Sequence, residues 1–113
     1  MMTEKQAQEY IEYLKKYRRP RPIPENELKY LQTFGPDTNA FTDVYGYYAA
    51  MTAESWHASH GNSGKAPTLG KCIRAANQGI ILASYEYMKG DGSQDFMKFA
   101  QSYIQAELEK ISQ

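Results

Sequence analysis

The sequence predicts an all-α protein, a compact bundle of four main helices plus one short helix after a proline-rich strap. Three observations support this fold class. Apolar residues recur at three- and four-residue steps along four long segments, which is the spacing of one helix face. Segments rich in glycine or proline separate them. No segment shows the alternating apolar and polar pattern of a strand. A chain of 113 residues has the length of one domain, so we expect a single helical-bundle domain over 1–113.

The first predicted helix covers residues 4–18. Thr3 and Gln6 have the spacing of a capping box, in which each side chain binds the other's backbone N–H group. One face then carries Ala7, Tyr10, Ile11, Leu14 and Tyr17. Alternate prolines at 20, 22 and 24 favour an extended strap, because proline fixes φ and lacks a donor. A short helix is expected within residues 25–34, and Gly35-Pro36 ends it.

The next long helix is predicted over about residues 38–58, with Asp37 or Thr38 as its cap. Its inward face should carry Phe41, Val44 or Tyr45, Tyr48, Met51 or Thr52, and Ser55. A loop rich in glycine follows, and Thr68 is placed to cap the next helix. The last predicted helix covers residues 94–111, after the turn Gly90-Asp91-Gly92-Ser93.

The helix that follows Thr68 has the most regular pattern in the chain. Its apolar seam consists of Leu69, Ile73, Ala76, Ile80, Ala83 and Tyr87. A second stripe contains Cys72, Ala75, Gly79 and Leu82. Gly79 weakens the helix by about 1 kcal/mol relative to alanine, but with its alanine neighbours it makes a smooth strip that lets another helix approach closely. A helix that is apolar on two faces lies either at the centre of the bundle or at a subunit contact.

Composition limits the functional classes. Lys plus Arg number 13 and Asp plus Glu number 13, so the formal net charge of zero excludes a strongly basic coat for nucleic acid. A single cysteine, Cys72, excludes an internal disulfide and a multi-cysteine zinc site. The polar start, Met1 to Gln6, lacks the apolar stretch of a secretory signal. The aliphatic run from Gly79 to Ala83 is too short for a membrane span. We therefore expect a cytoplasmic protein.

One cationic stretch is a candidate partner-binding or anion-binding site, and we call it the basic arc. It consists of Lys15, Lys16, Tyr17, Arg18, Arg19 and Arg21. Arginine can bind a phosphate or carboxylate through two hydrogen bonds, and tyrosine can stack on a ring. The alternative is a solvated helix end, since cations are favoured there by the helix dipole.

A second candidate anion site contains Lys65, Lys71 and Arg74. The preceding Gly-Asn-Ser-Gly-Lys segment has part of the spacing of a phosphate-binding loop, but Ser59 and Ala66 stand where that motif needs glycine and a hydroxyl residue. Nucleotide hydrolysis is therefore not expected. A phosphate held at the start of the helix without cleavage is compatible with these residues. The alternative is a loop whose glycines only turn the chain.

Aromatic density suggests a further interface, because the ten tyrosines cannot all face one core. The interface candidates are Tyr45, Tyr47, Tyr48, Tyr85, Tyr87 and Gly79. Tyrosine is favoured at protein interfaces since it buries a large area and keeps a polar tip. These residues predict a homo-oligomer.

Residues with catalytic or metal-ligating chemistry are few. The only enzyme candidates are Glu86, His57, His60 and Cys72. No nucleophile, base and acid occur together in a known pattern, and a site built from His57, His60 and Cys72 fits no strict zinc spacing. We therefore assign no catalytic residue, no metal and no cofactor.

These observations favour a non-enzymatic interaction protein that binds a macromolecule through tyrosine-rich faces and the basic arc. The alternative is a binder of a small anionic, nucleotide-like ligand at a subunit interface. Gln78-Gly79-Ile80-Ile81 loosely resembles the second helix of small phage helical-hairpin proteins that sequester cyclic-nucleotide signals, although Ile80 and Ile81 replace the Phe and Met of that helix. The small size and style of the chain suggest an accessory protein of a phage or mobile element. A small enzyme with an unrecognised site is the third hypothesis.

Overall fold

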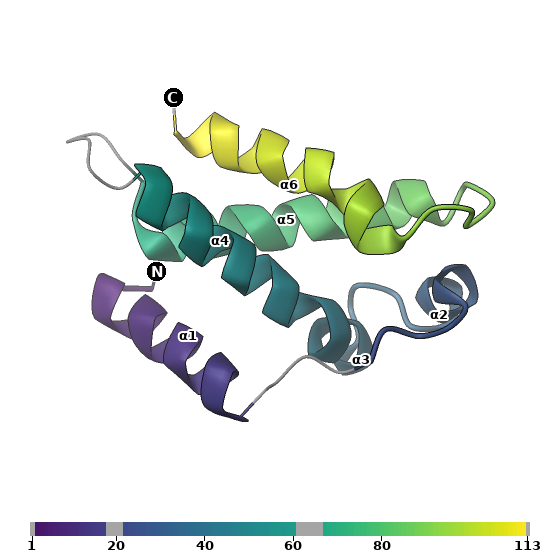
Figure 1. Cartoon of the computed structure of the whole chain (residues 1–113), viewed down its shortest axis with the longest axis horizontal. Coiled ribbons are helices and arrows are strands. Elements are labelled where there is room, and N and C mark those ends of the chain that lie inside the picture. Colours follow the sequence, from purple (N-terminus) through teal and green to yellow (C-terminus); the bar gives the residue numbers. More distant parts are fainter. Residues whose placement is uncertain (1, 18–21, 61–66, 113) are drawn as a thin grey trace.

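The computed structural model describes residues 2–17, 22–60 and 67–112, and these ranges contain helices and connecting segments but no strand (Figure 1). The predicted all-α bundle is confirmed. The elements are α1 (Glu4–Tyr17), α2 (Glu27–Thr33), α3 (Asn39–Phe41), the π-helical segment η1 (Thr42–Gly46), α4 (Tyr47–His60), α5 (Leu69–Tyr87) and α6 (Phe96–Ile111). No helix in the described part of the chain combines the length and hydropathy needed to cross a bilayer.

Local capping signals determine where several helices begin. The Thr3 amide donates to Gln6 Oε1 at 3.0 Å, and the Gln6 amide donates to Thr3 Oγ1 at 3.1 Å, which confirms the predicted capping box. Thr38 caps α3, and Thr68 caps α5 by accepting from the Lys71 amide at 3.2 Å. These contacts satisfy backbone donors that have no partner inside the helix.

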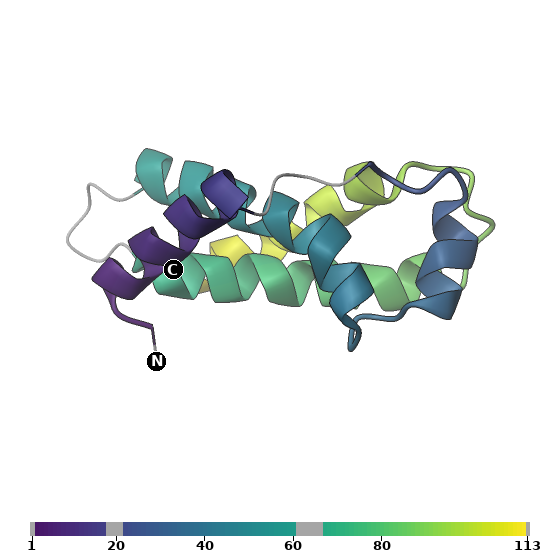
Figure 2. The ribbon, with the colours of Figure 1, turned by 90° about the horizontal axis from the view of Figure 1, so that it is seen from below.

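Helix α5 is the central helix of the bundle, because it packs against α6, α4 and α1 (Figures 1 and 2). All six residues of its predicted seam are buried. The second stripe is buried apart from Leu82, which is 39% exposed. A Cβ atom at Gly79 would lie 2.6 Å from Cα of Ile104 on α6. The predicted close approach of a helix at Gly79 is therefore observed within one chain.

The segment η1 changes which residues of the following helix face the core. A π-turn contains one residue more than an α-turn, so the inward face moves one residue along the sequence. The prediction placed Tyr48 and Thr52 or Met51 inward, but the buried residues of α4 are Ala49, Ala50 and Ala53. Helical periodicity alone was wrong here because it assumes an uninterrupted α-helix.

Helix α2 is attached to the far end of the bundle through Glu27. Its Oε2 accepts from the Tyr45 hydroxyl at 2.7 Å, and its Oε1 accepts from the Phe96 amide at the start of α6 at 3.1 Å. Leu28 packs against Gly92, whose φ of +70° is accessible to glycine at little cost. Figure 2 shows α2 beside the connection between α5 and α6.

Candidate functional site

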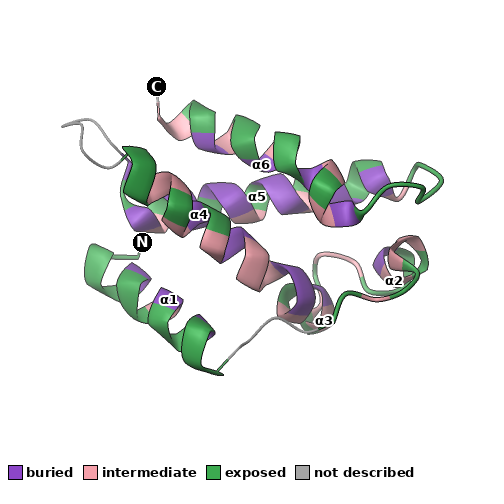
Figure 3. Ribbon diagram, in the orientation of Figure 1, coloured by how far each residue is buried: buried purple, intermediate pink, exposed green. Residues whose placement is uncertain are grey.

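The exposed end of α1 carries a cluster of aromatic and cationic side chains. Tyr13 and Tyr17 are 46% and 65% exposed, and their ring centroids lie 5.4 Å apart. The Lys16 ammonium lies 5.3 Å from the Tyr17 ring centroid. We call Tyr13, Lys16 and Tyr17 the α1 patch. Figure 3 shows that the outward side of α1 is exposed along its length.

The structure divides the predicted basic arc. Lys15 turns toward α4, where its Nζ lies 3.0 Å from Glu54 Oε2, and this hydrogen bond raises the pKa of Lys15. Lys16 and Tyr17 stay on the exposed surface. Three members lie outside the described residues, namely Arg18, Arg19 and Arg21. Sequence reasoning did not include Tyr13, although its position one turn before Tyr17 was a sufficient signal.

The tyrosines proposed for an interface have different environments. Tyr45 and Tyr87 are buried, and they pack on Phe96 with centroid distances of 4.8 and 5.2 Å. Burial is the main cause that raises the pKa of both phenols. Together with Gly79 they belong to the core of the chain, so they are not available to a second copy. Tyr47 and Tyr48 are half-buried, and Tyr85 is 48% exposed.

A hollow of about 400 Å³ lies on the exposed face of α5, near the start of the chain. Lys71, Arg74, Asn77 and Gln78 contribute its polar side chains. Neither cation forms an ion pair with another described residue. Its apolar lining consists of Met2, Ile73 and Ile81. Lys71 and Arg74 of the second predicted anion site are therefore brought together, whereas Lys65 lies outside the described residues.

The helix N-terminus itself is not free to hold a phosphate, which corrects that part of the prediction. The Leu69 amide donates to Glu4 Oε1 at 2.6 Å, and Thr68 already caps the Lys71 amide. A carboxylate at this position uses the same backbone donors and the same helix dipole that would attract an anion. On this face the cationic groups without such a partner are the side chains of Lys71 and Arg74.

A second, smaller hollow of about 180 Å³ adjoins the first, since Asn77 and Ile81 line both. Its wall includes Tyr10 from α1 and Phe41 from α3, together with Thr42 and Gly46. The last two residues belong to η1. Isolated π-turns occur often at functional sites, because they reshape a helix surface at a cost in stability. Sequence periodicity contained no signal for this hollow.

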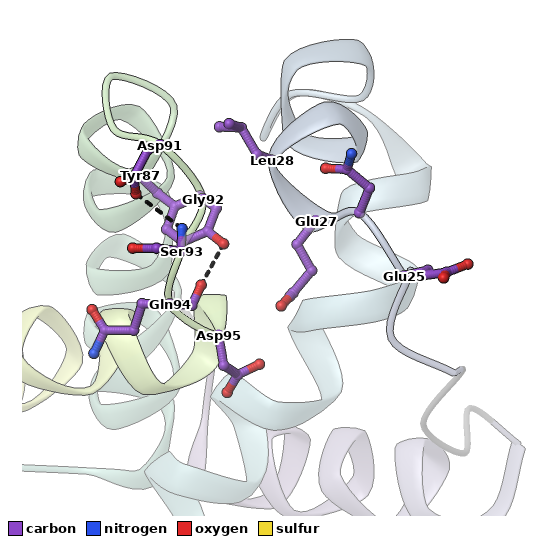
Figure 4. A pocket seen from close by; sticks show the side chains of 10 residues that line it. Glu25, Glu27, Leu28, Tyr87, Asp91, Gly92, Ser93, Gln94 and Asp95 are labelled. Atoms are coloured by element: carbon purple, nitrogen blue, oxygen red, sulfur yellow. Dashed lines mark hydrogen bonds between the residues drawn. The ribbon is translucent and has the colours of Figure 1, made fainter.

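A third hollow, of about 630 Å³, is acidic and lies between the start of α2 and the turn before α6. Figure 4 shows Glu27 and Leu28 across from the segment that carries Asp91 and Asp95. Three of these acidic side chains have structural roles. Glu27 joins α2 to α6, Asp91 accepts from the Ser93 amide, and Asp95 caps α6. Burial raises the pKa of Glu27 more than its hydrogen bonds from Tyr45 and Phe96 lower it, and nearby Asp95 raises it further.

The enzyme candidates do not form one site. His60 stacks on Trp56 at 4.0 Å and its Nδ1 lies 2.9 Å from the Trp56 carbonyl oxygen, whereas His57 lies 3.9 Å from Glu4. Cys72 is buried, and burial raises the pKa of its thiol. Glu86 pairs with Lys89 on the surface. Across the described ranges, no three His, Cys, Asp or Glu side chains are grouped so that they could hold a metal ion.

No protein family model matches the chain, and no curated protein or solved structure gave a match either. We therefore infer function from the geometry of the α1 patch and of the hollows on α5.

Proposed function

We propose that this protein is a non-enzymatic binding protein that recognises an acidic surface of a partner protein through the end of α1. The observation that supports the proposal best is the exposed pair Tyr13 and Tyr17 with Lys16 beside it. Tyrosine and arginine dominate the binding energy of protein interfaces, because they bury much area and make directed polar contacts. Arg18, Arg19 and Arg21 follow this patch directly in sequence.

Charge balance favours a protein partner over a nucleic acid. Proteins that bind nucleic acids gain much of their affinity from an excess of cations that release condensed counterions. This chain has a formal net charge of zero, and Lys15 is already paired with Glu54. Lys16 beside two aromatic rings, followed in sequence by three arginines, matches a small acidic and apolar surface better than a long phosphate backbone.

A displayed library of random peptides of about 12 residues tests the proposal, because acidic surfaces are represented in it without knowledge of the partner. We expect wild-type protein to enrich peptides in which Asp or Glu lies next to aliphatic or aromatic residues. The double variant Lys16→Glu with Tyr17→Ala should bind these peptides at least about tenfold more weakly than wild-type protein does. The matched control is Lys29→Glu with Phe34→Ala, which changes an exposed lysine and an exposed aromatic residue at α2.

Two results would contradict the proposal. The first is enrichment of peptides that bind the α1 variant and the control variant equally well. The second is tighter binding of a random single-stranded oligonucleotide pool than of any selected peptide, with a steep decrease as salt rises, which would identify a nucleic acid as the partner. The double variant Arg18→Glu with Arg19→Glu should also bind the selected peptides more weakly than wild-type protein does.

A further inference from the structure

We infer that the two adjoining hollows on α5 form a binding groove for a small organic anion, namely a phosphate ester of a planar ring. This site is separate from the α1 patch, and it does not depend on the proposed function. It is formed by side chains of α5 together with Met2, α1 and the α3–η1 segment.

The larger hollow supplies the charge that an anionic group requires. Lys71 and Arg74 both line it and have no ionic partner among the described residues. Arginine binds a phosphate through two parallel hydrogen bonds, and lysine adds a point charge. Glu4 accepts from the Leu69 amide and Thr68 accepts from the Lys71 amide, so the side chains of Lys71 and Arg74 are the cationic groups that remain for an anion on this face.

The smaller hollow suits a planar ring. Tyr10 is half-buried and contributes an aromatic surface, and half-buried Ile81 contributes an apolar contact from α5. Phe41 and Ile80 are 4% and 2% exposed, so they form only the floor of this hollow. Asn77 lies where the two hollows meet, and its amide offers both a donor and an acceptor to polar atoms on a ring edge. Binding sites for small molecules combine such apolar walls with a few polar groups that fix orientation.

The length of the groove matches a ligand of this kind. Arg74 and Ile81 are seven positions apart on α5, which corresponds to about 10 Å along the helix axis. A nucleoside monophosphate has a similar length from phosphate to ring. Gly46 and Thr42 of η1 form part of the wall, so the π-turn gives the ring end its shape.

Isothermal titration calorimetry with four probes tests the inference: adenosine monophosphate, phenyl phosphate, adenosine and inorganic phosphate. Wild-type protein should bind both esters with a Kd below about 1 mM, and should bind adenosine and inorganic phosphate at least about tenfold more weakly. The double variant Lys71→Ala with Arg74→Ala should bind both esters about tenfold more weakly, or weaker still. Asn77→Ala should weaken the binding of adenosine monophosphate and leave the binding of inorganic phosphate unchanged.

The charge-matched control is Lys98→Ala with Lys110→Ala, which removes two exposed cations from α6 and should leave ester binding unchanged. Circular dichroism verifies that every variant is folded. Absence of ester binding to wild-type protein at millimolar concentration overturns the inference, as does equal binding by the Lys71 and Arg74 variant. Inorganic phosphate that binds as tightly as the esters would overturn the assignment of the ring subsite. None of these three results would affect the peptide selections that test the α1 patch.

Discussion

Replacement of Gly79 by alanine should destabilise the protein, although alanine is the better helix former. The added Cβ would lie 2.6 Å from Ile104 Cα, 2.8 Å from Ile104 N and 2.9 Å from Tyr103 O. All three are backbone atoms of α6, so no side-chain rotation can relieve the contact. Ordinary contact begins at 3.4 Å, so α6 must move by about 0.8 Å relative to α5.

The energetic cost follows from this displacement. A gap of 0.5–1 Å removes about a quarter to a half of the dispersion energy between facing atoms. If about 40 atom pairs of roughly 0.15 kcal/mol each are affected, the loss is about 1.5–3 kcal/mol. The higher helix propensity of alanine offsets about 1 kcal/mol of this loss. We therefore expect a net decrease of about 0.5–2 kcal/mol in the free energy of unfolding, or a decrease in Tm of several degrees.

Urea unfolding followed by circular dichroism measures this change, with Gly70→Ala as the matched control on the same helix. At Gly70 the three nearest atoms to the added Cβ belong to Met2, the first two at 3.1 and 3.3 Å. Met2 is 37% exposed and lies outside the helices, so it can shift at little cost. Gly70→Ala should therefore be neutral or stabilising. A Gly79→Ala variant that is as stable as Gly70→Ala would refute the packing argument. Gly79→Leu, which adds three further carbons, should disrupt the bundle.

Three further predictions concern buried groups. Tyr45→Phe should lower the free energy of unfolding by about 1–2 kcal/mol, because Glu27 loses the hydroxyl that donates to it, and urea unfolding at neutral pH measures the change. Since burial raises the pKa of Glu27 above its ordinary 4.5, the folded state binds its proton more readily than the unfolded state does. The free energy of unfolding of wild-type protein, measured relative to that of Glu27→Gln, should then be greatest below pH 4.5 and decrease as the pH rises through the raised pKa. An increase of this difference with pH would contradict a raised pKa of Glu27. The Cys72 thiol, buried and with a raised pKa, should react with a thiol reagent only as fast as the protein unfolds, and rapid labelling without urea would be inconsistent with its burial.

Much of the fold was predictable because its signals are local. The Thr3–Gln6 capping box and the Thr38 and Thr68 caps join residues within one helix turn, and consecutive residues of the α5 seam are three or four positions apart. Such contacts depend on the helix period and on the chemistry of near neighbours. They are therefore visible in a single sequence, and the structure confirms them.

Tertiary structure decided which of the candidate residues lie on a free surface. Tyr45 and Tyr87 have the same side chain as Tyr13 and Tyr17, yet the first pair packs around Phe96 and the second pair faces solvent. Sequence spacing cannot distinguish them, since the contacts that bury Tyr45 join it to residues 18 and 51 positions away.

The groove on α5 was also beyond sequence reasoning, for the same physical reason. Lys71 and Arg74 were visible as a pair of cations, but the aromatic wall opposite Asn77 comes from Tyr10 and Phe41 on other elements. The hydrogen bond from the Leu69 amide at the start of α5 to Glu4 likewise joins residues that are 65 positions apart. The helices and their caps were determined by local sequence, whereas the register after η1, the occupied helix end and the hollows were determined by how distant segments pack.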